Sequence, residues 1–435
     1  MRLAEQWIAG RLALVRALAR FPAAVFPIVV AGTHGASSAT DIFFLVYAGV
    51  LFAANTFALV ETAVVPFVPG ARRRHEGDRF VAAVFSRVAL LLTPVAVSLA
   101  GGALFWRYVL KPPPAGWEDG WLHLLILSAL PAINAPAAVL SGYLNATERF
   151  LVPALAMGLR GVTALAIGFW MSPALGLPAY SGGILCGEVI ALGWLLGASR
   201  IRLDRLSHAE MSTSIQPFWT LFLSLIAGGV ANSSKGFVDR FVASMLGPGA
   251  VSLLEYAERL FLMTVSFLGA PLATVLLSRW AATFDGFTRL GDDLRQALRR
   301  AQRVAFALGL SILAVFLLIT VSPGRQLLVG RFSPDESRLV WLALGMYVLG
   351  AIPYLLGLVA TQAILVLRDS RFVTTVSVVA ALANVPLDLL GKAAFGLPGI
   401  ALGSSVLYSG HWIATELRIR SLTSRTLPAA SRNAP

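Results

Sequence analysis

The chain has 435 residues, of which 57% are hydrophobic and only 13% are charged, and its mean hydropathy is +0.76. These values lie far from the balance of a soluble domain and exclude a soluble enzyme or binding module. The net charge is +13, which in a soluble protein would raise the question of nucleic-acid binding. Here the arginines cluster in alternate loops between apolar runs, so orientation in a membrane explains the charge. We therefore expect an integral membrane protein without a nucleic-acid partner.

Apolar runs recur along the chain, and each is long enough to cross a bilayer core roughly 30 Å thick with about 20 residues. The runs do not alternate in polarity, as VALLLTPVAVSLAGGALF shows, which argues against a membrane β-barrel. The predicted fold class is an all-α integral membrane protein with about twelve transmembrane helices. Three spans are expected between residues 198 and 340, and the others near residues 13–32, 42–68, 81–109, 121–143, 151–171, 179–198, 340–366, 373–391 and 398–416.

Positive charges set the predicted orientation of these spans. The turn THGASSATD after the first span has no Lys or Arg and is expected outside, whereas ARRRHEGDR after the second span marks the cytoplasm. The segment 279–303 is rich in arginine and is either an amphipathic helix on an anionic membrane surface or a solvated loop. The outer loop 323–338 carries some positive charge and is a weak exception to the rule. Both termini are predicted to be cytoplasmic.

The two halves of the chain resemble each other. At an offset of 212 residues, VVAGTHGASSATDIFFLVYA overlays FVASMLGPGAVSLLEYAERL, and later matches keep the same order. This predicts two six-helix lobes related by pseudo-two-fold symmetry around a central cavity, with access to the substrate alternating as one lobe rocks against the other. We expect an N-terminal lobe at 1–200, a cytoplasmic linker at 201–215, a C-terminal lobe at 216–420 and a cytoplasmic tail at 421–435.

The stretch 239–280 places ionisable side chains within or beside apolar segments, where such groups are costly and usually functional. They are Asp239, Arg240, Glu255, Glu258 and Arg259. Arg259 either pairs with Glu255 one helical turn away or meets an anionic headgroup, because the guanidinium fork matches phosphate and pyrophosphate. We favour the headgroup role and include the adjacent Glu258 among the substrate-binding candidates.

Three further charges belong to the first two spans. Arg20 is either a second phosphate contact or a side chain that reaches the cytoplasmic interface. Asp41 is either a gate or a negative charge that caps the start of the second span. Glu61 has no obvious local partner in the sequence, which favours a polar contact across the lobes.

A second constellation offers oxygen ligands, from Asp239, Asn384, Asp388 and Ser404. Asn384 and Asp388 are four residues apart and share a helix face, and Pro386 between them loosens the helix and exposes backbone carbonyls. Carboxylate, amide and carbonyl oxygens are ligands for a hard cation. The alternative is two salt bridges, from Asp388 to Lys392 and from Asp239 to Lys235, and spacing alone favours this alternative.

The run DRFVASMLGPGAVSLLEYAERLF, followed by LGAPLATVLLSRW, closely resembles the lipid II flippases of the MurJ (MviN) type, within the multidrug/oligosaccharidyl-lipid/polysaccharide exporter superfamily. GASSATDIFF, ETAVVPFVP and GYLNATERFLVPA are similar to further motifs of this family, so the resemblance covers most of the chain. It implies a bacterial inner-membrane transporter that moves an undecaprenyl-pyrophosphate-linked glycan from the inner to the outer leaflet, with no covalent chemistry. The implied partners are membrane lipids and cell-wall or polysaccharide synthesis enzymes.

The resemblance also implies roles for individual residues. Arg259 matches the arginine of the family's central cationic cavity, and Asp41 and Glu61 match acidic positions tied to transport and gating. The positions at which some members bind sodium, the candidate coupling ion, correspond to Asp239, Asn384, Asp388, Ser404 and, through its carbonyl, Ile400. In contrast, PAAVFPIVV and VLFAANTF lack the arginines that members usually carry there, and typical members have further spans after the twelfth.

These departures leave other functions open. An exopolysaccharide or O-antigen flippase would carry a different lipid-linked glycan. A cation-coupled drug exporter would share the fold but bind cationic compounds, and Arg259 argues against it. A membrane-embedded glycosyltransferase would need catalytic groups in a large outer loop, whereas the five histidines are scattered along the chain. The sequence therefore favours a transporter over an enzyme.

Overall fold

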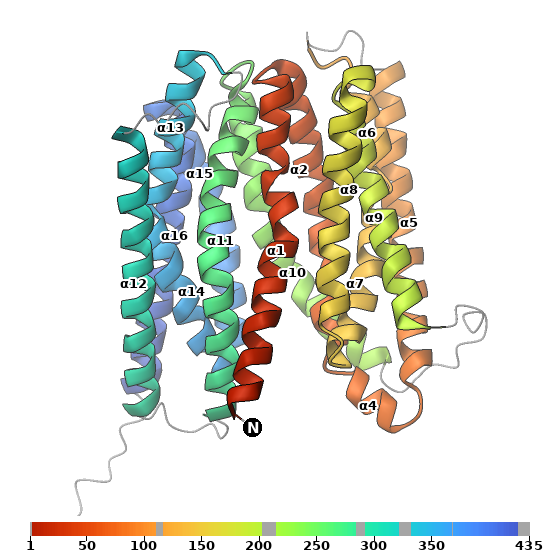
Figure 1. Ribbon diagram of the computed structural model, residues 1–435, viewed down its shortest axis with the longest axis vertical. Helices are drawn as coiled ribbons and strands as arrows, with labels where there is room; N and C mark the ends of the chain where they lie inside the picture. The colour runs from red at the N-terminus through yellow and green to blue at the C-terminus, as the bar shows by residue number, and fades with distance from the viewer. Residues whose placement is uncertain are drawn as a thin grey trace, which may run out of the picture. The chain divides into compact units, whose positions relative to one another are not determined.

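The computed structural model describes residues 2–109, 116–201, 215–283, 292–321, 332–367 and 369–424. Within these ranges the regular secondary structure is helical throughout (Figure 1). The helices are α1 (Arg2–His34), α2 (Ser38–Ala58), α3 (Val60–Val64), α4 (Val68–Arg73), α5 (Gly77–Tyr108), α6 (Gly120–Leu127), α7 (Leu130–Ala146), α8 (Leu151–Leu175), α9 (Pro178–Ser199), α10 (Ile215–Ser244), α11 (Ala250–Thr283), α12 (Asp292–Val321), α13 (Pro334–Leu349), α14 (Ala351–Val366), α15 (Ser370–Phe395) and α16 (Leu397–Ser424).

In the described part of the chain, 9 helical segments are long and apolar enough to cross a membrane. Three of these segments contain a short break, so that α2 with α3, α6 with α7, and α13 with α14 each form one span. The other predicted spans fall on α1, α11 and α16. The prediction of an all-α membrane protein with about twelve spans is therefore confirmed.

The chain divides into two compact units, Met1–Glu255 and Tyr256–Pro435, with the boundary inside α11. The division into lobes at 201–215 stays a prediction, because residues 202–214 of the expected linker lie outside the described residues. The same applies to residues 284–291 of the arginine-rich segment, to residues 323–331 of the outer loop and to residues 425–435 of the tail.

The first unit has a core built from helices that contribute small and aromatic side chains. Phe218 and Phe222 of α10 stack at 5.9 Å, and Phe80 of α5 meets Phe218 edge to face at 5.9 Å. Helices α8 and α9 run side by side (Figure 1). Their backbones approach closely because Gly183 and Gly187 of α9 present no side chain to α8.

The second unit packs α16 against α13, α14 and α15. Aromatic rings fill its interior: Phe261 of α11 stacks on Tyr347 of α13 at 5.6 Å, and Tyr354 of α14 meets Tyr408 of α16 at 5.1 Å. Helices α15 and α16 touch through their backbones at Gly391 and Gly399. A side chain at either glycine would overlap the carbonyl oxygen of the other.

We expect Gly399→Ala to destabilise the second unit by about 1–3 kcal/mol, because the added methyl forces α15 and α16 apart. Equilibrium unfolding in mixed micelles measures this loss. Gly410→Ala on the same helix is the matched control, since a methyl there meets no atom within 4 Å. Equal stability of the two variants would show that α15 and α16 do not approach as closely as described.

Candidate functional site

Asp41 lies buried in the first turn of α2, with 5% of its surface exposed. Its carboxylate accepts hydrogen bonds from the backbone N–H of Gly249 at 2.6 Å and of Ser252 at 2.8 Å, and from the Ser252 hydroxyl. These donors belong to the start of α11, where helical N–H groups have no partner within the helix. One of the two roles offered for Asp41 was to cap its own helix, but α2 is capped by Ser37 in a capping box with Thr40. Asp41 instead caps α11.

We call the contact formed by Asp41, Gly249 and Ser252 the α2–α11 contact. Next to it, α2 and α10 pack through apolar side chains. Phe52 of α2 stacks on Phe237 of α10 with ring centroids 6.3 Å apart. Gly49 brings the α2 backbone against the same Phe237 ring, 3.3 Å from where a side chain would begin. A buried polar contact and an apolar face together hold α2 against the α10–α11 hairpin.

Arg240 and Glu255 form a buried ion pair across the turn between α10 and α11. Arg240 is 7% and Glu255 2% exposed. The Arg240 Nε donates to Glu255 Oε2 at 2.6 Å, and its Nη2 donates to the same oxygen. Its Nη1 donates to the Gly236 carbonyl at 2.5 Å. Glu255, which spacing offered as a partner for Arg259, is thus bound by Arg240.

The remaining substrate-binding candidates lie on α1, α3 and α11. Arg259 and Glu258 are half-buried on α11, and Arg20 is exposed on α1. Glu61 accepts a hydrogen bond from Asn145 Nδ2 at 2.9 Å. Asn145 belongs to α7, so this contact lies within the N-terminal half of the chain and not across the predicted lobes. The roles of all four residues in substrate binding stay predictions.

The structure brings part of the predicted cation site together on α15 and α16. Asn384 is only 1% exposed and Asp388 is fully buried. Asn384 Nδ2 donates a hydrogen bond to Asp388 Oδ2 at 3.0 Å. Asp388 Oδ1 faces Gly403 of α16, 3.0 Å from where a side chain there would begin. Ile400 and Ser404 flank this position and are buried. This oxygen-rich donor set fits a hard cation.

Asp239, the fifth member, is 3% exposed on α10 in the first unit. Among the described residues, no three His, Cys, Asp or Glu side chains lie together in a way that would hold a metal ion. A cation on α15 and α16 would therefore depend on amide, hydroxyl and carbonyl oxygens as well as on Asp388. The sodium site stays a prediction.

A polar cluster that sequence reasoning missed lies on α7, α8 and α9, and we call its residues Asn134, Arg160 and Glu188 the α7–α9 cluster. Arg160 Nε lies 2.9 Å from Glu188 Oε1, and Asn134 Nδ2 donates to the same oxygen at 3.4 Å. Glu188 is 4% exposed. The signal in the sequence is a carboxylate inside the otherwise apolar run GGILCGEVIALGW.

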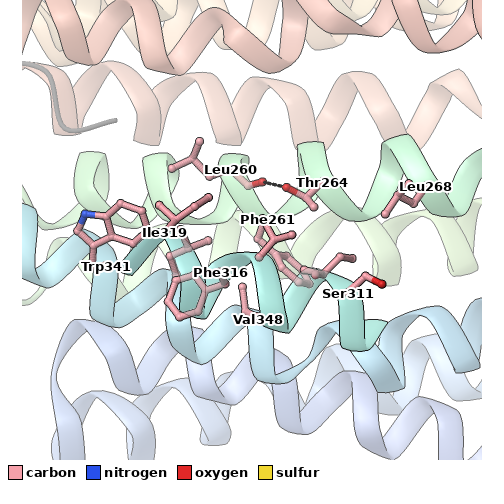
Figure 2. A pocket seen from close by; sticks show the side chains of 12 residues that line it. Leu260, Phe261, Thr264, Leu268, Ser311, Phe316, Ile319, Trp341 and Val348 are labelled. Carbon is pink, nitrogen blue, oxygen red and sulfur yellow. Dashed lines mark hydrogen bonds between the residues drawn. The ribbon is translucent and has the colours of Figure 1, made fainter. Parts of the chain in front are cut away.

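A separate cavity of about 230 Å³ lies in the second unit between α11, α12 and α13 (Figure 2). Its two hydroxyl-bearing residues bond to their own helices: Thr264 Oγ1 donates to the Leu260 carbonyl and Ser311 Oγ to the Ala307 carbonyl, each at 2.9 Å. Phe261, Phe316 and other apolar side chains form most of the rest of the lining. The cavity suits hydrocarbon and not a charged headgroup.

Comparison with known proteins gives one consistent result. The family model described as lipid II flippase MurJ matches residues 30–425. The probable lipid II flippase MurJ of Thermotoga maritima is 23% identical over 409 residues, covering 92% of this chain and 82% of that protein. The lipid II flippase MurJ of Burkholderia cenocepacia is 25% identical over 415 residues, covering 88% and 79%, respectively.

Solved structures of two kinds of transporter share the fold. A lipid II flippase MurJ in an inward closed conformation has a TM-score of 0.76 at 19% identity, covering 97% of this chain and 90% of that chain. An inward-facing multidrug resistance MATE family transporter of the MOP superfamily has a TM-score of 0.77 at 16% identity, covering 95% and 99%. The predicted two-lobed fold agrees with this class of transporter.

Proposed function

Because the chain belongs to the lipid II flippase MurJ family, we propose that it carries lipid II from the inner to the outer leaflet of the bacterial cytoplasmic membrane. The observation that carries this proposal is the family match over residues 30–425, nearly the whole chain. The protein is then a transporter that makes and breaks no covalent bond. Its partners are the membrane lipids around it and the cell-wall enzymes that make and use the lipid, and both termini lie in the cytoplasm.

Transport proceeds in this proposal by alternating access. The α2–α11 contact supports it, because a buried carboxylate and three donors from another helix form a discrete closure. Opening must break these hydrogen bonds together, which favours two distinct states over continuous motion. The headgroup enters from one side while this contact is closed and leaves after it opens, and the lipid tail remains in the bilayer.

Arg259 is proposed to bind the pyrophosphate of the headgroup. A guanidinium group forms bidentate, charge-assisted hydrogen bonds with phosphate oxygens, and Arg259 is half-buried on α11 and so retains access. Arg20, exposed on α1, is the second candidate phosphate contact. Glu258, next to Arg259, and Glu61, which Asn145 holds in place, are proposed to position the headgroup or its gate.

Sodium is proposed as the coupling ion, bound by Asp388, Asn384 and their neighbours. We expect sodium to raise the unfolding temperature of the chain in detergent, because a ligand that binds only the folded state stabilises it by mass action. Asp388→Asn should abolish this increase, whereas Asp335→Asn, which changes an exposed carboxylate, should retain it. An equal change in the unfolding temperature of the wild type with sodium and with choline would show that the chain has no specific sodium site.

The proposed function is tested in bacterial cells depleted of their own flippase. Wild-type chain should restore lipid II to the outer leaflet, where an externally added modifying enzyme detects it. Arg259→Ala, expressed at the same level, should fail to restore outer-leaflet lipid II. Arg420→Ala, which changes an exposed cation, should restore it like the wild type. Correct membrane insertion without restoration by the wild type would contradict lipid II as the cargo and turn attention to exopolysaccharide precursors.

A further inference from the structure

The residues of the α7–α9 cluster lie near the middle of candidate membrane spans, and the cluster holds the only full charges of its helices. Glu188 is at the middle of α9, Asn134 at the middle of the span Gly120–Ala146, and Arg160 near the middle of α8. Within the helices α6, α7, α8 and α9 there is no other Asp, Glu, Lys or Arg. Ionisable groups at this depth are costly in a bilayer and are usually retained for function.

The two oxygens of Glu188 have different surroundings. Oε1 contacts both Arg160 Nε and Asn134 Nδ2. Oε2 is buried and has no hydrogen-bond partner among the described residues. A buried ionised oxygen without a partner costs free energy, and a proton on that oxygen lowers this cost because a neutral group is cheaper to bury than a charge. Glu188 therefore has one oxygen held by a cation and one prepared to accept a proton.

A metal ion is a poor fit for the same position. The guanidinium of Arg160, 2.9 Å from Oε1, would repel a second cation. Hard cations also take six or more oxygen ligands, whereas the cluster offers one carboxylate and one amide. The chemistry therefore points to a proton as the ligand.

The Arg160 side chain is 34% exposed, while that of Glu188 is only 5% exposed. Arg160 is therefore the member of the pair that has room to change its contacts, whereas Glu188 is enclosed. Helices α8 and α9 pack closely, because a side chain at Gly187 would begin 2.5 Å from the Arg160 carbonyl and one at Gly183 2.7 Å from that of Ala164. A rotation of the Arg160 side chain separates the pair without disturbing this packing.

We propose that Glu188 is a proton-binding site of the transporter. Its carboxylate is ionised while it pairs with Arg160, and Oε2 takes up a proton from water when Arg160 withdraws. The positive charge of the guanidinium is thus exchanged for that of the proton, and Glu188 stays neutralised in both states. Its use in the transport cycle rests on the proposed function, whereas the binding of the proton does not.

Other titratable groups on the packed helices have partners elsewhere. His123 of α6 is 2.9 Å from the Ser181 hydroxyl. Tyr180 of α9 is bonded to Thr33 at 3.0 Å, and Tyr143 of α7 donates to Asp78 at 3.3 Å. Cys186, two residues before Glu188, is exposed. The charge that faces Glu188 from α7 and α8 is therefore Arg160, with Asn134 as the polar neighbour.

The test is infrared difference spectroscopy of the purified full chain in lipid nanodiscs during a pH titration. The wild type should gain a carboxylic-acid carbonyl band on acidification, and Glu188→Gln, which keeps the side-chain volume, should lose that component. Arg160→Gln should move the midpoint of this component about 1–3 pH units upward, since an opposite charge at this distance disfavours protonation by that amount. Cys186→Ala, on the same helix, should titrate like the wild type.

Identical titrations of the wild type, Glu188→Gln and Arg160→Gln would overturn the proposal. If Glu188→Gln does not fold, as judged by its unfolding temperature, the shift in Arg160→Gln decides, because its presence supports the site and its absence refutes it. A failure of the proposed function is recognised separately, by a wild type that moves no lipid II while the Glu188 component still titrates.

Discussion

Arg240→Ala is expected to lower the free energy of unfolding by about 3–5 kcal/mol, which is the usual cost of removing one partner of a buried ion pair. The substitution leaves the Glu255 carboxylate, 2% exposed, without the guanidinium that now donates to it. Equilibrium unfolding in mixed micelles measures the change. Arg240→Met combined with Glu255→Leu should recover most of the loss, because well-packed apolar side chains often replace a buried pair without cost.

The control for this experiment is Arg420→Ala. Arg420 pairs with Glu416 at 3.3 Å but its side chain is 72% exposed, and exposed pairs contribute about 0–1 kcal/mol. If Arg240→Ala is no more destabilising than Arg420→Ala, the buried pair does not hold α10 and α11 together. If the double variant is as unstable as the single one, the loss comes from packing around Arg240 and not from the orphaned charge.

Asp41→Ala is expected to release the start of α11. Two buried backbone N–H groups lose their acceptor, and each unsatisfied donor costs about 1–3 kcal/mol. A total of about 3 kcal/mol corresponds to roughly 100-fold faster hydrogen exchange of the Gly249 and Ser252 amides. Mass spectrometry of peptides from this segment measures the exchange, and transport of lipid II should fall in the same variant because the closed state is no longer held.

Two further variants serve as comparisons for the exchange rate of Asp41→Ala. Asp41→Asn retains one acceptor oxygen and should give an intermediate rate. Glu118→Ala removes an exposed carboxylate outside the spans, whose pKa is lowered by hydrogen bonds from its own backbone N–H and that of Gly116, and should leave the exchange unchanged. If the Gly249 and Ser252 amides of Asp41→Ala exchange at the wild-type rate, the α2–α11 contact does not hold the start of α11 in place.

The helices and their order follow from sequence, because apolar runs of membrane-spanning length leave the backbone no alternative to helical hydrogen bonding. The breaks inside three spans were not predicted. Each is only a short interruption of an otherwise apolar run, at Leu59, Ser128–Ala129 and Gly350. Hydropathy averaged over a whole span does not resolve such breaks.

The candidate site residues could be predicted from their residue types. Their partners could not, because most of them are far away in the sequence. Asp41 meets donors 208 and 211 positions away, so a cap on its own helix was the only partner that sequence distance offered. Arg240 and Glu255 are 15 positions apart and meet only because the chain reverses at GPG between them. Glu188 was overlooked because a single carboxylate hardly lowers the mean hydropathy of its run.

The proposed function requires that this chain move lipid II across a bilayer with Arg259 bound to the headgroup. The most direct measurement uses the purified chain in liposomes that carry lipid II in the inner leaflet, and follows its appearance outside with an impermeant reagent. We predict rapid appearance with the wild type and with Arg420→Ala, and a rate near that of protein-free liposomes with Arg259→Ala. A wild-type rate equal to that of protein-free liposomes, with the chain inserted and folded, would contradict a role of this chain in moving lipid II.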